Sequence, residues 1–354
     1  MTKLFSNLWK LPTLGVFLTG TAFAEPPPAP KGFMWVVNED FTDEFNGDAL
    51  NSEKWYDHHP RWRGRPPARF MPENVSVKDG MLQLTNGTLD ESISSRHGEF
   101  TLGGAAVVSK KTEAYFGYYE CRLRASSISM SSTFWMSNSG QHYPGVGRIS
   151  QELDIQETVG GSKRNEKFAR YMNSNTHVWH GGDSDHIGNK AELPTKSDEA
   201  FYVYGCWWED ASKCHFYLNN EHVGTVEFDT TLTEEPFRHP MHINMVTETY
   251  DWETPPTPEE INDPSRNTTY IDWVRAYVLV PTDGSLADWQ LKKLKEQPRE
   301  WKSANGKSST KAKLVKAKHG YAYLRKKGGK EIRVPVKLLC KEDRELLEKV
   351  MASN

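Results

Sequence analysis

Three acidic residues lie close together in the middle of the sequence, where Glu152 and Asp154 alternate with Leu153 and Ile155 and are followed by Glu157. Successive side chains of a β-strand point to opposite faces, so Glu152 and Asp154 should share one face while the two aliphatic residues pack on the other. Strict alternation would place Glu157 on the aliphatic face. We therefore predict a β-bulge between Asp154 and Glu157, which would return Glu157 to the acidic face.

Carboxyl groups in this arrangement have the chemistry of a retaining glycosidase. Such an enzyme needs two carboxyls about 5 to 5.5 Å apart, an ionised nucleophile and a protonated acid, on either side of the scissile bond. A third carboxyl between them would raise the pKa values of its neighbours and could orient the nucleophile through a hydrogen bond. The alternative is a solvated acidic strand or a calcium site. The alternation with aliphatic residues favours catalysis, because it places charge on a sheet face that would otherwise pack or bind.

Short alternating runs separated by turn residues surround this segment, from about residue 35 to residue 281. Runs at 75–77 and 81–85 each precede a turn dipeptide, Asp79-Gly80 and Asn86-Gly87. Similar runs occupy 117–123, 201–208, 215–218, 241–246 and 271–280. So many strands predict an all-β fold, with two antiparallel sheets stacked as a jelly-roll sandwich.

The composition agrees with a globular, aromatic-rich protein of 354 residues, long enough for one large domain and a small one. Hydrophobic residues make up 37% of the chain, which contains 12 Trp, 14 Tyr and 15 Phe. Indole rings suit stacking on the flat faces of sugars, although Trp also fills the cores of β-sandwiches.

The N-terminal region has the features of an exported protein. Lys3 and Lys10 accompany an apolar stretch at 11–23 that ends in Ala22-Phe23-Ala24. This pattern predicts a signal peptide of residues 1–24, cleaved after Ala24, and a secreted or periplasmic protein. Residues 25–34 would form a Pro-rich linker, and no later stretch approaches the length of a membrane span.

The C-terminal region differs sharply in charge, since residues 286–354 hold about 19 Lys and Arg and about 8 acidic residues. We expect a catalytic sandwich at 35–281, a linker at 282–310 and a small basic β-rich module at 311–354. Residues 312–336 alternate like a β-meander, and 341–351 should form a helix with Leu346, Leu347 and Val350 on one face.

The four cysteines are too scattered for a disulfide framework or a zinc site. Pairing of Cys206 with Cys214 is an alternative to buried thiols. No cofactor is expected for catalysis.

The Glu-x-Asp-x-x-Glu motif in this β-rich context resembles the laminarinase-type glycoside hydrolases of family 16, which have a concanavalin A-like jelly roll. Supporting segments, at 41–45, 105–124, 132–136 and 271–277, extend across the whole predicted sandwich. The resemblance implies that Glu152 is the nucleophile, Glu157 the general acid/base and Asp154 the assisting carboxylate. It also implies that Trp135 stacks on a sugar in the cleft. The alternative is that Trp135 is a buried core residue.

Within that family, the segment at 62–70 resembles the branch that acts on red-algal galactans, which includes agarases and porphyranases. Trp62 lies there with Arg63, Arg65 and Arg69, and guanidinium groups bind sulfate esters bidentately. A solvated arginine loop is the alternative. By the same resemblance His177 and Glu248 are candidates to hydrogen-bond sugar hydroxyls, and Asp272, Gly80 and Asp43 resemble a structural calcium site, although Asp272 suits a turn equally.

The basic module resembles the small, SH3-like Sla-homology domain, through segments at 312–314, 320–325, 329–335 and 338–343. Its charge could hold the protein on a sulfated polysaccharide or an anionic cell surface, or the module could be a spacer. We expect a monomer with a polysaccharide substrate and no nucleic-acid partner.

Three alternatives compete with a galactan hydrolase. A carbohydrate-binding module would not need three carboxyls together, and a polysaccharide lyase would use Tyr or His as the base. The arginine-rich loop makes a β-glucan substrate less suitable. The motifs leave open whether the galactan is agarose, porphyran, furcellaran or a carrageenan.

Overall fold

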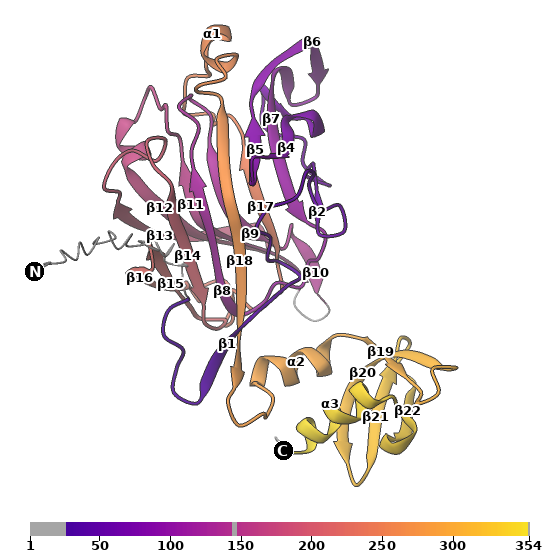
Figure 1. Ribbon diagram of the computed structural model, residues 1–354. Coiled ribbons are helices and arrows are strands. Elements are labelled where there is room, and N and C mark those ends of the chain that lie inside the picture. Colours follow the sequence, from indigo (N-terminus) through magenta and orange to yellow (C-terminus); the bar gives the residue numbers. More distant parts are fainter. Residues whose placement is uncertain (1–25, 144–146, 353–354) are drawn as a thin grey trace, which may run out of the picture.

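The computed structural model describes residues 26–143 and 147–352, which form a large β-sandwich and a small C-terminal module (Figure 1). The expected signal peptide lies outside the described residues. No helix within this part of the chain has both the length and the apolar character needed to cross a membrane.

The first sheet of the sandwich has eight strands. Its order is β16 (Glu221–Glu227), β15 (Lys213–Leu218), β14 (Tyr202–Trp208), β8 (Gly117–Arg124), β18 (Thr268–Pro281), β5 (Met81–Thr85) and β4 (Val75–Lys78), with β1 (Phe33–Val37) paired to β18. All of these strands pair in the antiparallel direction.

The second sheet has ten strands and carries the acidic motif. Its order is β13 (Asp183–Glu192), β12 (Tyr171–His180), β11 (Gly147–Thr158), β9 (Ser132–Ser137), β17 (His242–Thr247), β7 (Gly98–Ser109) and β2 (Trp55–Tyr56). Three further strands join it, β10 (Gln141–Tyr143) on β11, and β3 (Ala68–Phe70) and β6 (Gly87–Ser95) on β7. The β3–β7 pair is parallel, and the other pairs are antiparallel.

Alternation of apolar and polar residues builds the core between these sheets. Leu82 and Leu84 of β5 are fully buried, whereas Gln83 between them is not. On β11, Leu153 and Ile155 enter the same core, so the acids between them face away from it. Trp55 and Trp208 are core residues, so the sandwich uses some of its indole rings for packing. The predicted jelly-roll sandwich is confirmed.

The C-terminal module has its own four-stranded sheet, in the order β19 (Arg299–Lys302), β20 (Ser309–Lys318), β21 (Tyr321–Lys326) and β22 (Glu331–Pro335). The module begins earlier than residue 311, because β19 is its edge strand and Trp301 is buried in its core. The expected linker at 282–310 therefore also contains helix α2 (Asp288–Glu296).

Three helices complete the structure, together with short 3-10 turns at Pro72–Asn74, Glu166–Arg170 and Val336–Leu338. Helix α1 (Pro258–Ile261) is a single turn in the sandwich, and α3 (Lys341–Ala352) closes the module core with Leu347 and Val350 buried. The predicted C-terminal helix and its apolar face are confirmed.

All four cysteines are free thiols, and Cys206 and Cys214 are fully buried on neighbouring strands. The alternative of a disulfide between them is wrong in this structure.

Candidate active site

A β-bulge in β11 brings the three motif acids to one face of the second sheet. Against β9, Glu152 is opposite Ser137, Asp154 is opposite Trp135 and Glu157 is opposite Thr133, with the register shift between Asp154 and Gln156. The β12 side shows the same irregularity between Asp154 and Glu157. The predicted bulge is confirmed, and its extra length is taken up by Ile155 and Gln156, which are both fully buried.

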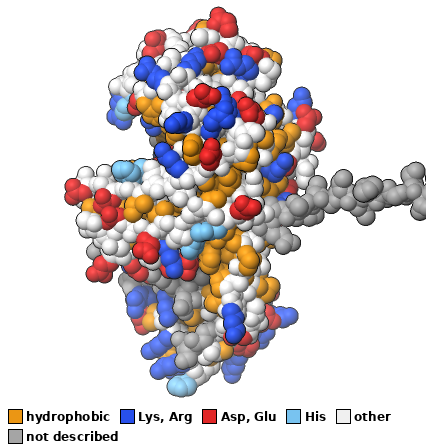
Figure 2. Space-filling model, turned by 90° about the vertical axis from the view of Figure 1, so that its left-hand side faces the viewer, with side chains coloured by type: hydrophobic (Ala, Val, Ile, Leu, Met, Phe, Trp, Pro, Cys, Tyr) orange, Lys and Arg blue, Asp and Glu red, His pale blue; other side chains and the backbone are white. Residues whose placement is uncertain are grey.

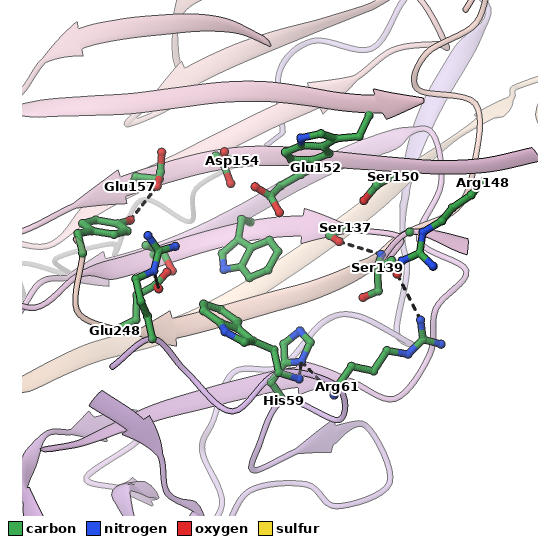
Figure 3. Close-up of a pocket in the computed structure, with 17 residues that line it drawn as sticks. His59, Arg61, Ser137, Ser139, Arg148, Ser150, Glu152, Asp154, Glu157 and Glu248 are labelled. Atoms are coloured by element: carbon green, nitrogen blue, oxygen red, sulfur yellow. Dashed lines mark hydrogen bonds and ion pairs between the residues drawn. The ribbon is translucent and has the colours of Figure 1, made fainter. Parts of the chain in front are cut away.

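The acids lie in a cleft of about 760 Å³ on the outer face of that sheet (Figure 3). Strands β9 and β11 form its floor, because every second residue of each strand points into it. The lining residues are His59, Arg61, Trp62, Arg65, Thr133, Trp135, Ser137, Ser139, Gly140, Arg148, Ser150, Glu152, Asp154, Glu157, Trp179, Glu248 and Tyr250. The cleft therefore contains four carboxyl groups, three indole rings and three guanidinium groups.

The carboxyl groups are positioned by specific neighbours. The Tyr250 hydroxyl donates a hydrogen bond of 2.7 Å to Glu157 Oε1. On the β12 side, a nitrogen of His177 and one oxygen each of Glu152 and Asp154 lie within 4.8 Å of one another. Arg65 Nε lies 3.1 Å from Glu248 Oε2, so the fourth carboxyl has a cationic partner.

Burial and mutual repulsion set the protonation of these acids. Loss of hydration, followed by the charge of Glu157, raises the pKa of Glu152 to about 7, while Arg65 acts in the opposite direction. Burial raises the pKa of Asp154 well above its usual range, and the charges of both glutamates add to this. Burial also raises the pKa of Glu157, and it raises the pKa of Glu248 to about 8. The cluster therefore retains protons at neutral pH.

His177 faces the acids from β12 as a neutral imidazole. Its Nε2 is 3.5 Å from Asp154 Oδ2, and burial lowers the pKa of His177 to about 4. Its ring stacks on Trp179 at 5.3 Å between centroids. His177 therefore touches the acids and supports an indole ring of the cleft, without itself lining the cleft. Together with Glu152 and Asp154 it is also the set that could hold a cation.

Aromatic rings form the side of the cleft beside β9. Trp62 and Trp135 are partly buried against Phe70, Ala106 and Val246 and also border the cleft. His59 stacks on Trp135 with centroids 6.4 Å apart. Trp135 thus combines features of the two roles considered from the sequence, since its ring packs on a small apolar cluster and also lines the cleft.

Of the three arginines in the 62–70 segment, only Arg65 lines the cleft. Arg63 lines a neighbouring hollow, which shares Trp62 and Arg65 with the cleft, and Arg69 does not line the cleft. Gly64 has φ +104, and the Phe70 amide donates a hydrogen bond of 2.9 Å to the Arg63 carbonyl, so the segment between them loops back on itself. Two cations from elsewhere take their place at the far end of the cleft, Arg61 from the preceding loop and Arg148 from β11. Neither has a carboxylate partner among the described residues, and Arg61 contacts the Ser139 carbonyl at 3.4 Å (Figure 3).

Several lining residues were not predicted as site residues, among them His59, Arg61, Arg148, Trp179 and Tyr250. Arg148 lies four residues before Glu152 on the same strand, so the period of two already placed it on the cleft face. No comparable signal marked His59 or Arg61, which lie in a loop.

The residues of the predicted calcium site have other partners. Asp272 forms an ion pair with Arg122 at 2.6 Å, and Asp43 accepts hydrogen bonds from the Trp55 indole and the Phe45 amide. Gly80 lies in a turn with φ +71. The calcium site stays a prediction.

Comparison with known proteins gives two family matches. Residues 35–279 match the family described as beta-porphyranase A-D, GH16 domain, and residues 292–354 match SLA1 homology domain 1. Beta-porphyranase E of Zobellia galactanivorans is 47% identical over 72% of this chain and 91% of its own length. Beta-porphyranase B of Phocaeicola plebeius is 45% identical over 73% of this chain and 88% of its own.

Solved structures agree with these matches. The crystal structure of a beta-porphyranase from the human gut bacterium Bacteroides plebeius superposes with a TM-score of 0.67 at 44% identity, covering 73% of this chain and 96% of that one. The structure of beta-agarase A in complex with oligoagarose has a TM-score of 0.62 at 20% identity, over 74% of this chain and 98% of that one, and so shares the fold.

Proposed function

Because the chain belongs to glycoside hydrolase family 16, in its beta-porphyranase branch, we propose that it is a secreted, retaining endo-hydrolase that cleaves β-glycosidic bonds in porphyran. The observation that carries the proposal is the cleft itself. It combines three carboxyls on one strand face with indole rings and with two guanidinium groups, of Arg61 and Arg148, that pair with no carboxylate in residues 26–143 and 147–352. The predicted signal peptide supports export, which a polymeric substrate requires.

In this proposal Glu152 is the nucleophile and Glu157 the acid/base. Asp154 has its pKa raised well above the usual range and lies beside Glu152, so it holds a proton that it can donate in a hydrogen bond to the Glu152 carboxylate. That hydrogen bond favours the ionised form of Glu152. The Tyr250 hydroxyl fixes one oxygen of Glu157 and leaves its other oxygen for the glycosidic bond.

The reaction then proceeds in two steps. Glu157 gives its proton to the glycosidic oxygen while Glu152 attacks the anomeric carbon, so that the carbon–oxygen bond breaks and a glycosyl ester forms on Glu152. Water then attacks the same carbon, Glu157 takes its proton, and Glu152 leaves as a carboxylate. Two inversions retain the anomeric configuration.

The arginines at the far end of the cleft favour a sulfated galactan. A sulfate ester accepts two parallel hydrogen bonds from a guanidinium group, whereas a neutral galactan leaves such a cation without a matching charge. Arg65 is less suited to this role because Glu248 and Asp251 already face it, at 3.1 Å and 3.6 Å. Arg61 and Arg148 are therefore the sulfate-binding candidates, and porphyran is preferred over agarose.

Release of reducing ends by the chain from residue 25 tests this assignment. Porphyran, chemically desulfated porphyran, agarose, furcellaran, κ-carrageenan and laminarin should be compared in parallel. We expect porphyran to be cleaved fastest, and Arg148→Ala to reduce that rate while sparing any residual rate on desulfated polymer. Faster cleavage of agarose would refute sulfate recognition, and cleavage of laminarin alone would refute the galactan assignment.

A further inference from the structure

The outer face of the module's sheet is strongly basic. Alternation along β20 sends Ala312, Leu314 and Ala317 into the module core, while Lys311, Lys313, Lys316 and Lys318 are exposed on the opposite face. Across β21 and β22 the same face continues with Tyr321, Tyr323, Arg325 and Arg333. We call this set of eight residues the basic face. Figure 2 shows Lys and Arg side chains around the lower end of the molecule, where the module lies.

Little of this charge is neutralised within the protein. Two carboxylates share this face, Glu331, which pairs with Arg325 at 2.6 Å, and Glu300 of β19, which lies opposite Lys311 in the register. The four lysines of β20 and Arg333 have no carboxylate partner in the part of the chain that the structure describes. Five cations on one side of a small sheet repel one another, so a polyanion that binds there relieves that repulsion.

The two tyrosines of the basic face lie among these cations. The register places Tyr323 between Lys316 and Arg333, and Lys316 Nζ is 4.9 Å from the centre of the Tyr323 ring. The Arg333 guanidinium lies over the Tyr321 ring at 3.8 Å. The rings thus hold these cations against the sheet, where their donors can pair with sulfate esters. The eight residues of the basic face include no aliphatic side chain that could insert into an anionic membrane, and the exposed Leu338 of the module is not among them.

The position of the basic face links it to the catalytic cleft. A second hollow, of about 730 Å³, lies between the two units. Gln141 and Tyr143 of β10 and Lys311 and Lys313 of β20 line it, and so do the carboxylates Glu113 and Glu296. Strand β10 follows directly after Gly140, which lines the cleft together with Arg148. A polymer that leaves the cleft past Arg61 and Arg148 therefore meets β10 and then the lysines of β20.

We propose that the basic face is a second binding surface for the sulfated galactan, continuous with the arginine end of the cleft and separate from the site of cleavage. This proposal rests on the proposed function for the choice of polymer. Lysines suit the task because they are flexible point charges that can follow successive sulfates without a fixed geometry.

The test compares two triple variants of the full chain that change net charge equally. One carries Lys313→Glu, Lys316→Glu and Lys318→Glu on the basic face, and the control carries Lys326→Glu, Lys327→Glu and Lys330→Glu around the β21–β22 turn. Binding to porphyran is measured by affinity electrophoresis in the inactive Glu152→Gln background. Cleavage is measured in the active background, on polymer and on oligosaccharides just long enough to fill the cleft.

We expect the basic-face variant to bind porphyran about tenfold more weakly or worse, with KM on polymer raised and kcat on oligosaccharides unchanged. The control should change binding by less than about twofold. Equal losses in both variants, unchanged binding in the basic-face variant, or stronger binding of the unaltered chain to phosphatidylserine vesicles than to porphyran would each overturn the proposal.

Two further measurements keep the outcome interpretable. Thermal unfolding checks that the module is folded, and a milder variant with Gln at the same three positions should weaken binding less if charge is the cause. Failure of the unaltered chain to cleave porphyran oligosaccharides would refute the proposed function alone, since binding to the basic face is measured without cleavage.

Discussion

Replacement of Arg65 by Gln should move the acidic limb of the pH–rate profile to higher pH. Arg65 is the cation that lowers the pKa values of Glu152, Glu157 and Glu248, and its pairing with Glu248 at 3.1 Å holds it beside the cluster. Glu152 must be ionised to attack, and its pKa is about 7 with Arg65 present. Loss of the positive charge destabilises the ionised form, so the pKa of Glu152 rises.

The size of the effect follows from distance and exposure. The Arg65 side chain is 38% exposed, so solvent screens its charge strongly. If a separation of about 6 Å and an effective dielectric constant of about 60 are taken for Arg65 and Glu152, two unit charges interact by about 1 kcal/mol, which corresponds to a pKa change of about 0.7. The acidic limb should therefore move from about 7 to about 7.7. The ratio of the variant's kcat/KM to that of the unaltered chain should be about fivefold smaller at pH 6 than at pH 9.

The assay is kcat/KM on porphyran oligosaccharides between pH 5.5 and 9, at substrate concentrations far below KM. Sulfate esters stay ionised over this range, so the limbs report groups of the enzyme. Arg63→Gln is the matched control, because this arginine is two residues from Arg65 in the sequence and does not line the cleft. An equal fall at every pH, a limb that moves to lower pH, or an equal shift in the control would refute the electrostatic reasoning.

Four further outcomes are expected. Glu152→Gln should reduce kcat on porphyran by several orders of magnitude without lowering the melting temperature, whereas near-normal turnover would exclude it as the nucleophile. Tyr250→Phe removes a hydrogen bond that lowers the pKa of Glu157, so the alkaline limb, which reports loss of the acid's proton, should move to higher pH. Trp301→Ala should destabilise the module by about 3–5 kcal/mol and leave the sandwich transition unchanged in calorimetry, because the two cores are separate. If the predicted calcium site is real, EDTA should lower the melting temperature of the sandwich and added calcium should restore it.

The strands, including the one that carries the catalytic acids, could be predicted from the sequence because each depends on the alternation of apolar and polar residues along a short segment. The period of two located β4, β5, β8 and β14, and the odd spacing of Glu157 revealed the bulge. The start of the module was missed because β19 has only four residues, and its main signal, the buried Trp301, becomes evident only once β20 packs beside it.

Loop residues mark the limit of this reasoning. Arg63, Arg65 and Arg69 were grouped because they are close in sequence, but only Arg65 lines the cleft. Arg61 and His59 reach the cleft through the path of a loop, which depends on tertiary packing. The sequence therefore indicates arginines near the cleft, and the structure places Arg65 in it together with Arg61 and Arg148.

The bulge after Asp154 makes the catalytic strand tolerant of a change in its length. Ile155 and Gln156 together take the place of one residue, so deletion of either would leave a regular strand with all three acids still on the cleft face. Evolutionary insertion or deletion at this point would thus leave the order of the carboxyls intact. If a relative that lacks the extra residue were aligned with this chain without a gap, its acid/base glutamate would be paired with Gln156, which is buried in the core.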